Sequence, residues 1–260
     1  MSSVPVATRS GRWFPVCGSA DVVPRHIVES ELLEQELAVW RGTDGTLNVW
    51  ANRCPHRGMR LSAGVNLGSE LRCAYHGYRF AGRTGRCTAV PAQPDRTAPQ
   101  SLCVSSFPAL ERYGLVWTRL APGAAEPEPW PAATRPLLAL YSVPVDASVA
   151  EVSRHLLDYR FRPAGSTSPP DAAAATCATR ALDDFTLESM ATVNDLSTII
   201  RFFLQPVAPT STVIHSRLVG PLAESLQLPT QRYHADCLGE LRTAMEKRPR
   251  SLPSTASVPR

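Results

Sequence analysis

Two short segments of this 260-residue chain combine cysteine with histidine at spacings that constrain its fold more than any other feature. The first segment reads Cys54-Pro-His56 and the second reads Cys73-Ala-Tyr-His76, with sixteen residues between them. Two thiolates and two imidazoles on two short loops can hold a [2Fe–2S] cluster, with both cysteines on one iron and both histidines on the other. These four residues are the candidate cluster ligands, and the strand and turn between the loops must bring them face to face.

A glycine follows each ligand pair, at Gly58 and Gly77. It lets the loop turn tightly and frees backbone N–H groups to hydrogen-bond the cluster sulfurs. Four ligands of this kind could also hold a structural Zn²⁺ ion. The other five cysteines lack close metal-binding neighbours and are interpreted as buried small hydrophobes or inert thiols: Cys17, Cys87, Cys103, Cys177 and Cys237. An odd count without a secretory signal does not predict a disulfide framework.

The first half of the chain has the pattern of short strands joined by tight turns. Strands expected at residues 36–41 and 47–52 flank Asp44-Gly45, which is a strong hairpin signal. Further strands are expected at 70–73, 78–80 and 113–118. No helical periodicity of useful length appears before Pro122. The pattern therefore predicts a small all-β domain over residues 1–121.

A proline-rich stretch then separates two regions of different composition. Residues 122–136 are expected to be a linker, since proline removes backbone donors from helix and sheet. A second domain is expected over 137–247 and a disordered tail over 248–260. Within the second domain the pattern predicts a helix at 148–160 capped by Ser148, a loop at 166–175, strands at 198–204 and 212–219, and a closing helix at 233–247.

The residues around the two ligand pairs extend the pattern well beyond the ligands. Segments 54–64 and 71–80 resemble the two cluster loops of the Rieske non-haem iron oxygenases, the terminal components of multicomponent hydroxylating and demethylating systems. Tyr78 stands where that family usually has Trp. Met59 and Tyr75 occupy the places of the extra cysteines of respiratory-chain Rieske proteins. The resemblance implies an α+β chain: an all-β Rieske domain, then a shortened antiparallel-sheet-plus-helix domain like the oxygenase catalytic domain.

In that family a mononuclear iron(II), held by two histidines and a carboxylate, receives electrons from the cluster. On the family's helix motif, N-x2-D-x2-H-x4-H, this chain keeps Asp158, whereas Phe161 and Ser166 occupy the two histidine positions. The resemblance implies that Asp158 bridges electrons between neighbouring subunits of a trimer. Asp236 lies roughly where the late carboxylate ligand is expected, although a helix-start residue is the preferred interpretation.

An alternative iron site could be rebuilt from other side chains. Glu151, His155 and Asp158 would share one face of the expected helix, with Asp236 as a further candidate. Three isolated histidines are interpreted as surface or satisfied core residues: His26, His215 and His234.

Two functional hypotheses follow. In the first, the chain is a Rieske-type oxidoreductase acting as an oxygenase component on a small organic substrate, which requires mononuclear iron in addition to the [2Fe–2S] cluster. In the second, it is a non-catalytic electron-transfer or accessory subunit that lacks this iron. Both imply a reductase or ferredoxin as electron donor, and either a homotrimer or a hetero-oligomer with a catalytic relative.

The composition excludes other classes of partner. The net charge of +4 is too weak, and its arginines too scattered, to predict nucleic-acid binding. No apolar segment approaches the ~20 residues of a membrane-spanning helix, and no signal peptide is visible. A cytoplasmic setting is therefore expected.

Overall fold

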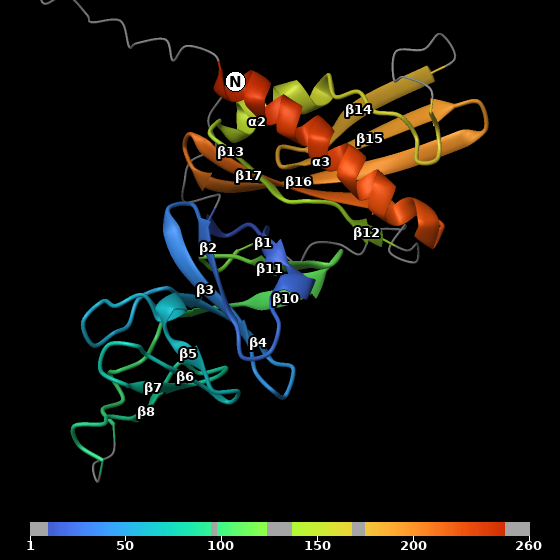
Figure 1. Ribbon diagram of the computed structural model, residues 1–260. Coiled ribbons are helices and arrows are strands. Elements are labelled where there is room, and N and C mark those ends of the chain that lie inside the picture. Colours follow the sequence, from blue (N-terminus) through green and yellow to red (C-terminus); the bar gives the residue numbers. More distant parts are fainter. Residues whose placement is uncertain (1–9, 95–97, 124–136, 168–174, 248–260) are drawn as a thin grey trace, which may run out of the picture.

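The computed structural model describes residues 10–94, 98–123, 137–167 and 175–247, and the chain over these ranges is mostly β. Within them it forms four antiparallel sheets and the helices α2 and α3. Figure 1 shows three small sheets in the N-terminal half and one large sheet, crossed by both helices, in the C-terminal half. The small sheet that carries the second predicted ligand loop lies at the end of the molecule farthest from the large sheet.

The N-terminal half is built from short strands in three sheets. One has the order β1-β11-β10 (Phe14–Gly18, Leu115–Thr118, Ala109–Arg112). The second has the order β2-β3-β4-β9 (Ile27–Leu32, Gln35–Arg41, Leu47–Ala51, Ser106–Phe107). The third has the order β5-β6-β7-β8 (Val65–Asn66, Glu70–Arg72, Arg79–Ala81, Cys87–Ala89). Two 3-10 turns, η1 (Ser19–Asp21) and η2 (Leu61–Ala63), join strands in this half.

The predicted hairpin between β3 and β4 is confirmed, and local chemistry explains it. Gly45 has φ of +80°, a conformation that glycine adopts without strain. The N–H of Gly42 donates to the carbonyl of Thr46 at 2.9 Å, and the Asp44 carboxylate accepts from the N–H of Thr46 at 2.9 Å. These bonds fix the register in which Trp40 lies opposite Asn48.

The C-terminal half is a single large sheet with two helices. The order β12-β17-β16-β15-β14 joins Leu137–Ala139, Ser211–Val219, Leu196–Ala208, Thr186–Val193 and Ala175–Asp183. Strand β13 (Val143–Val145) also pairs with β17. The strands predicted at 198–204 and 212–219 are confirmed as parts of β16 and β17. The hairpin of β14 and β15 was not predicted, and it begins at Ala175, the last residue of the predicted loop.

Helix α2 (Val149–Leu157) begins where the sequence predicts and ends earlier. Ser148 is its N-cap: its hydroxyl accepts from the N–H of Glu151 at 3.3 Å, and the Glu151 carboxylate accepts from the N–H of Ser148 at 3.0 Å. This reciprocal pair satisfies backbone donors at the helix start. The helix was predicted to run to residue 160, but Asp158 is its C-cap and therefore lies outside the helical face expected for it.

Helix α3 (Glu224–Glu246) is longer than predicted. It begins nine residues before the expected start at residue 233 and contains Pro229. Proline removes a helix donor and crowds the preceding turn, so it is usually read as a boundary. Here it lies within the second turn of the helix. The interpretation of Asp236 as a helix-start residue is consequently wrong, because Asp236 lies in the middle of α3.

One apolar core joins the two halves of the molecule. It contains Phe14 and Leu32 from the N-terminal sheets together with Leu204 and Ile214 from the large sheet. Phe14 meets Phe185 edge to face, with ring centroids 4.8 Å apart. A second, separate core lies beneath the ligand loops and contains both Cys54 and Cys73, with the following side chains: Ile27, Ala38, Trp40, Trp50, Leu61, Leu71, Phe80 and Val104.

Buried polar groups also cross between the halves. The Arg217 guanidinium of β17 donates to the carbonyls of Tyr113 and Gly114 at 2.9 Å each. The Gln205 amide of β16 donates to the carbonyl of Glu31 at 2.6 Å. These bonds satisfy carbonyls that would lose hydrogen bonds to water in this interface.

Some predicted features fall outside the described ranges. They include the tail at 248–260 and all of the predicted linker except residues 122 and 123. Over the described parts of the chain, no helix combines the length and apolar character needed to cross a membrane.

Candidate cluster-binding site

The two predicted ligand loops occupy equivalent positions and have the same backbone hydrogen bonds. The first follows β4, and the second joins β6 to β7. In the first, the N–H of Cys54 donates to Met59 at 2.8 Å; in the second, the N–H of Cys73 donates to Tyr78 at 2.9 Å. The N–H of the glycine four residues after each cysteine returns to that cysteine's carbonyl, at 2.8 Å and 3.2 Å respectively. The two loops are therefore local repeats of one turn.

Glycine is required in both turns by backbone conformation. Gly58 has φ of +74° and Gly77 has φ of +72°. L-residues with a side chain are strained in this region, whereas glycine is not. The sequence prediction that these glycines let the loops turn tightly is confirmed.

The cysteines point inward and the histidines lie at the surface. Cys54 is 3% exposed and Cys73 is 2% exposed, while His56 is half-buried and His76 is exposed. The Nδ1 atoms of the two histidines lie 3.1 Å apart. Two ring nitrogens that share one metal ion, each at about 2.1 Å, have about this separation. The loops thus bring a sulfur pair and a nitrogen pair together.

Burial acts in opposite directions on the pKa values of the two kinds of candidate ligand. Burial raises the pKa of Cys54 to about 11, an effect that nearby Cys73 increases. The thiolate therefore needs a cation to compensate it, as an iron ion would. Partial desolvation, with the charges of His76 and Arg57, lowers the pKa of His56. This favours the neutral imidazole, which is the form that binds metal.

The two metal groups left open by the sequence need different arrangements of their ligands. A structural zinc site needs its ligands to converge on one ion. Paired ligands facing each other, two sulfurs and two nitrogens, instead match the two irons of a [2Fe–2S] cluster.

Aromatic rings support both histidines, a feature that the sequence analysis missed. Tyr78 stacks on His56 with ring centroids 4.3 Å apart, and Tyr75 lies against His76 at 3.8 Å. Both tyrosines had been noted only as departures from related motifs. Their position one residue before His76 and two after it is the signal that could have identified them.

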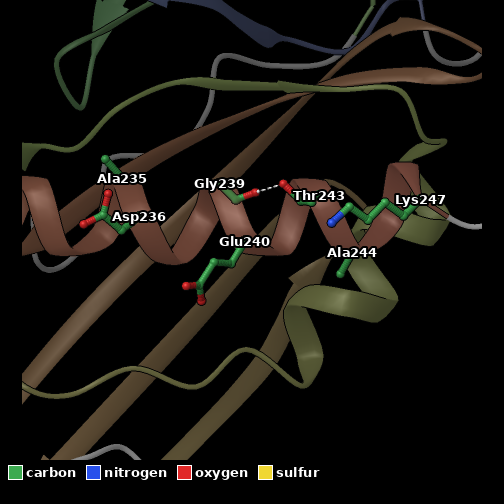
Figure 2. Close-up of a pocket in the computed structure, with 7 residues that line it drawn as sticks. All are labelled: Ala235, Asp236, Gly239, Glu240, Thr243, Ala244 and Lys247. Carbon is green, nitrogen blue, oxygen red and sulfur yellow. Dashed lines mark hydrogen bonds between the residues drawn. The ribbon is translucent and has the colours of Figure 1, made fainter.

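The side chains proposed for a rebuilt iron site form no metal-holding group of three or more among the residues that the structure describes. Glu151 is engaged by Ser148 at the start of α2, and Asp158 is exposed at the end of that helix. His155 lies on α2 between them. Asp236 lies on α3, where Figure 2 shows it along a shallow surface hollow. This hollow is lined by Ala235, Asp236, Gly239, Glu240, Thr243, Ala244 and Lys247.

The residues in the motif's histidine positions pack as ordinary structure. Phe161 is 1% exposed and lies beside Tyr159 and His234, with ring centroids at 5.7 and 5.2 Å. The Tyr159 hydroxyl is 3.1 Å from Nδ1 of His234. Burial lowers the pKa of His234 to about 4, so it is a neutral core residue. Ser166 is half-buried beyond the end of α2.

The other isolated histidines also have structural positions. His215 is buried on β17, where Nδ1 is 2.8 Å from the Ser142 hydroxyl and Nε2 is 2.8 Å from the Gln205 side-chain oxygen. His26 is exposed. Both positions agree with the interpretation as surface or satisfied core residues.

Comparison with known proteins identifies the first domain. Residues 12–108 match the family described as the Rieske [2Fe-2S] domain. Oxidoreductase NdmD of Pseudomonas putida is 33% identical over 90% of this chain, although the chain spans only 40% of that protein's length. Methylxanthine N1-demethylase NdmA of the same species is 35% identical over 42% of this chain, which spans 32% of that protein.

The solved structures extend the likeness to the fold of the whole chain. The structure of a Pseudomonas putida NdmA mutant with caffeine matches over 96% of this chain and 85% of that chain, with a TM-score of 0.72 and 19% identity. A likeness at that identity concerns the fold alone. Residues 12–108 of this chain are thus a Rieske [2Fe–2S] domain, and the chain shares its overall fold with NdmA.

Proposed function

We propose that this chain acts in electron transfer, with its cluster held by Cys54, His56, Cys73 and His76 and with no mononuclear iron in its second half. When bound, a Rieske cluster accepts and donates single electrons at a potential raised by its two histidine ligands. The equivalent turns, the buried cysteines and the 3.1 Å separation of the histidine nitrogens support this ligand set. Because the chain spans only part of its relatives' length, the activity and partners of the whole protein are also part of this proposal.

The observation that carries the electron-transfer role over the oxygenase role is the position of Phe161. Its ring packs between Tyr159 and His234 in the shared core, at the place where the family motif puts an iron ligand. A phenyl ring offers no lone pair to iron. It also fills space that an iron centre would need to keep open for oxygen.

The similarity to relatives points in the same direction. The demethylase NdmA is similar in sequence over 113 residues, about the length of a Rieske domain, whereas the oxidoreductase NdmD is similar over 248. We infer that the second half of this chain is more similar in sequence, and therefore in role, to the matching part of NdmD than to the second half of a demethylase.

The residues of this chain perform three tasks in such a role. The buried cysteines and the loop amides hold one side of the cluster in a water-poor environment. His76 is exposed, with the Tyr75 ring lying against it, and gives partner proteins access to the histidine side of the cluster. Asp158 is exposed and could contact a neighbouring subunit, as its proposed electron-bridging role requires. The assembly as a homotrimer or hetero-oligomer and the cytoplasmic setting remain predictions.

Iron analysis of anaerobically purified protein, combined with EPR spectroscopy, tests the proposal. We expect about two irons per chain and an EPR signal that appears on reduction. A third, non-cluster iron would contradict the electron-transfer role and restore the oxygenase hypothesis with a small organic substrate. Zinc in place of iron, without visible absorption, would contradict the cluster itself.

A further inference from the structure

Positive charge is concentrated in one part of the molecule. Residues 53–90, here called the cluster-loop lobe, contain seven arginines and one glutamate, while the whole chain has a net charge of only +4. The rest of the chain therefore has a net negative charge. The scattered distribution of arginines inferred from composition is wrong for this lobe, which Figure 1 places at one end of the molecule.

Four of these arginines surround the ligand loops and are here called the arginine rim: Arg53, Arg57, Arg72 and Arg79. Arg53 and Arg72 each directly precede a ligand cysteine, and Arg57 directly follows His56. Arg53 folds back over its loop, because a Cβ placed on Gly58 would lie 3.4 Å from its Nε. All four side chains are exposed.

The strand register places two rim arginines against each other. Arg72 of β6 is directly opposite Arg79 of β7. Like charges in directly opposite positions destabilise a sheet. The next pair, Leu71 and Phe80, is fully buried, so both arginines project from the solvent face. The chain retains this unfavourable pair beside the second ligand loop.

Three of the rim arginines lack the acidic partners that Arg60 and Arg83 of the same lobe have. Among the described residues, Arg53, Arg57 and Arg72 form no ion pair, and Arg79 approaches Glu70 only at 4.0 Å. In contrast, Arg83 pairs with Asp44 at 2.9 Å. Arg60 is also neutralised, by Glu36 and Glu29. Within the lobe, three of the four rim arginines thus form no ion pair among the described residues, and outside the rim only Arg86 shares this property.

An apolar surface accompanies the rim. Tyr75 is 58% exposed and lies against His76, and Met59 of the first loop is 37% exposed. Exposed apolar groups with charged residues around them are typical of protein interfaces. Electron-transfer complexes are among the smallest of these, so a surface of this size is sufficient.

We propose that the arginine rim is a docking surface for an acidic electron-transfer protein, which it guides onto Tyr75 and His76. The inference rests on the proposed function, because it assumes that the loops hold the cluster. Carboxylates on the partner would pair with guanidinium groups that are otherwise uncompensated. An extended polyanion such as nucleic acid fits less well, since the chain beyond the lobe is net negative and would repel it.

Binding of an acidic plant-type [2Fe–2S] ferredoxin to the cluster-loaded protein tests the proposal, with Kd measured by calorimetry. Each of R53Q, R57Q, R72Q and R79Q should weaken binding by about three-fold, as expected for exposed charge pairs. The quadruple variant should weaken it roughly 50- to 100-fold. Raising the ionic strength from about 0.02 to about 0.3 M should weaken wild-type binding strongly and the quadruple variant little.

A matched control removes the same charge elsewhere. Arg154, Arg160 and Arg232 lie outside the lobe, are exposed and belong to no ion pair among the described residues. Their triple change to Gln should alter Kd less than two-fold, whereas the matched rim triple R53Q/R57Q/R72Q should weaken binding roughly 30-fold. Equal weakening by the two triple variants would overturn the proposal, as would tighter binding of a short DNA duplex or no binding of the ferredoxin. The visible spectrum is recorded first, so a missing cluster contradicts the proposed function separately from the docking surface.

Discussion

Cys73 and Cys87 lie on the same small sheet but in different local environments. Cys73 directly follows β6 and begins the turn of the second ligand loop. Cys87 is the first residue of β8 and lies opposite Phe80 of β7. Burial raises the pKa of Cys87, which keeps it a thiol packed against the core beneath the loops. At the scale of single residues, position in a ligand-loop turn decides which of these two thiols can become a ligand.

Substituting these two cysteines should therefore give different results. Cys73→Ser removes a thiolate ligand and is expected to abolish the visible absorption and the bound iron. Cys87→Ser is its matched control and should keep the cluster, at a stability cost of no more than about 1 kcal/mol because Cys87 is only half-buried. Absorption spectra and iron analysis measure both. Equal loss of iron in the two variants would show that the ligand set is wrong.

At the scale of elements, the sequence predicted the features that depend on neighbouring residues and missed those that depend on residues far apart in the chain. The β3–β4 hairpin and the start of α2 depend on local signals, Asp44-Gly45 and Ser148, and both were predicted. The start of α3 was missed because the proline rule is local, while this helix is held by packing along the large sheet. The opposition of Arg72 and Arg79 could not be predicted, because it requires the register of two strands.

Glu151 provides a test at the same scale, because two roles were considered for it. As a capping residue, its change to Ala should destabilise α2 by about 1 kcal/mol, through loss of its bonds to Ser148. Iron content should not change. Urea unfolding and iron analysis measure the two quantities. A loss of iron without loss of stability would instead support a ligand role.

At the scale of the whole molecule, a chain of hydrogen bonds centred on His215 joins the two halves. His215 contacts Ser142 and Gln205, and the Gln205 amide donates to the Ser30 hydroxyl of β2 at 3.1 Å. Burial, with the nearby charge of Arg217, lowers the pKa of His215 to about 3. The histidine is therefore neutral in the folded protein at every pH where the protein is expected to function.

This buried histidine predicts a loss of stability in mild acid. Its folded pKa is below its unfolded value of about 6.5, so the unfolded state binds the proton first as pH falls. Its contribution is complete above pH 6.5 and is lost progressively toward pH 3, by about 2 kcal/mol at pH 5. His215→Gln should lose less stability between pH 7 and pH 5 than wild type, measured by thermal unfolding. Exposed His26→Gln is the control and should behave like wild type.

The apolar core shared by β1, β2 and the large sheet explains why a second half without an iron site would be retained. Phe14 and Leu32 are almost completely covered by it, and a chain cut after the cluster domain would expose these side chains to water. Ligand histidines could be exchanged for residues such as Phe161 at no cost to this contact. Loss of the large sheet would instead expose the shared core to water. Selection for stability would therefore retain the sheet even after an iron site had been lost.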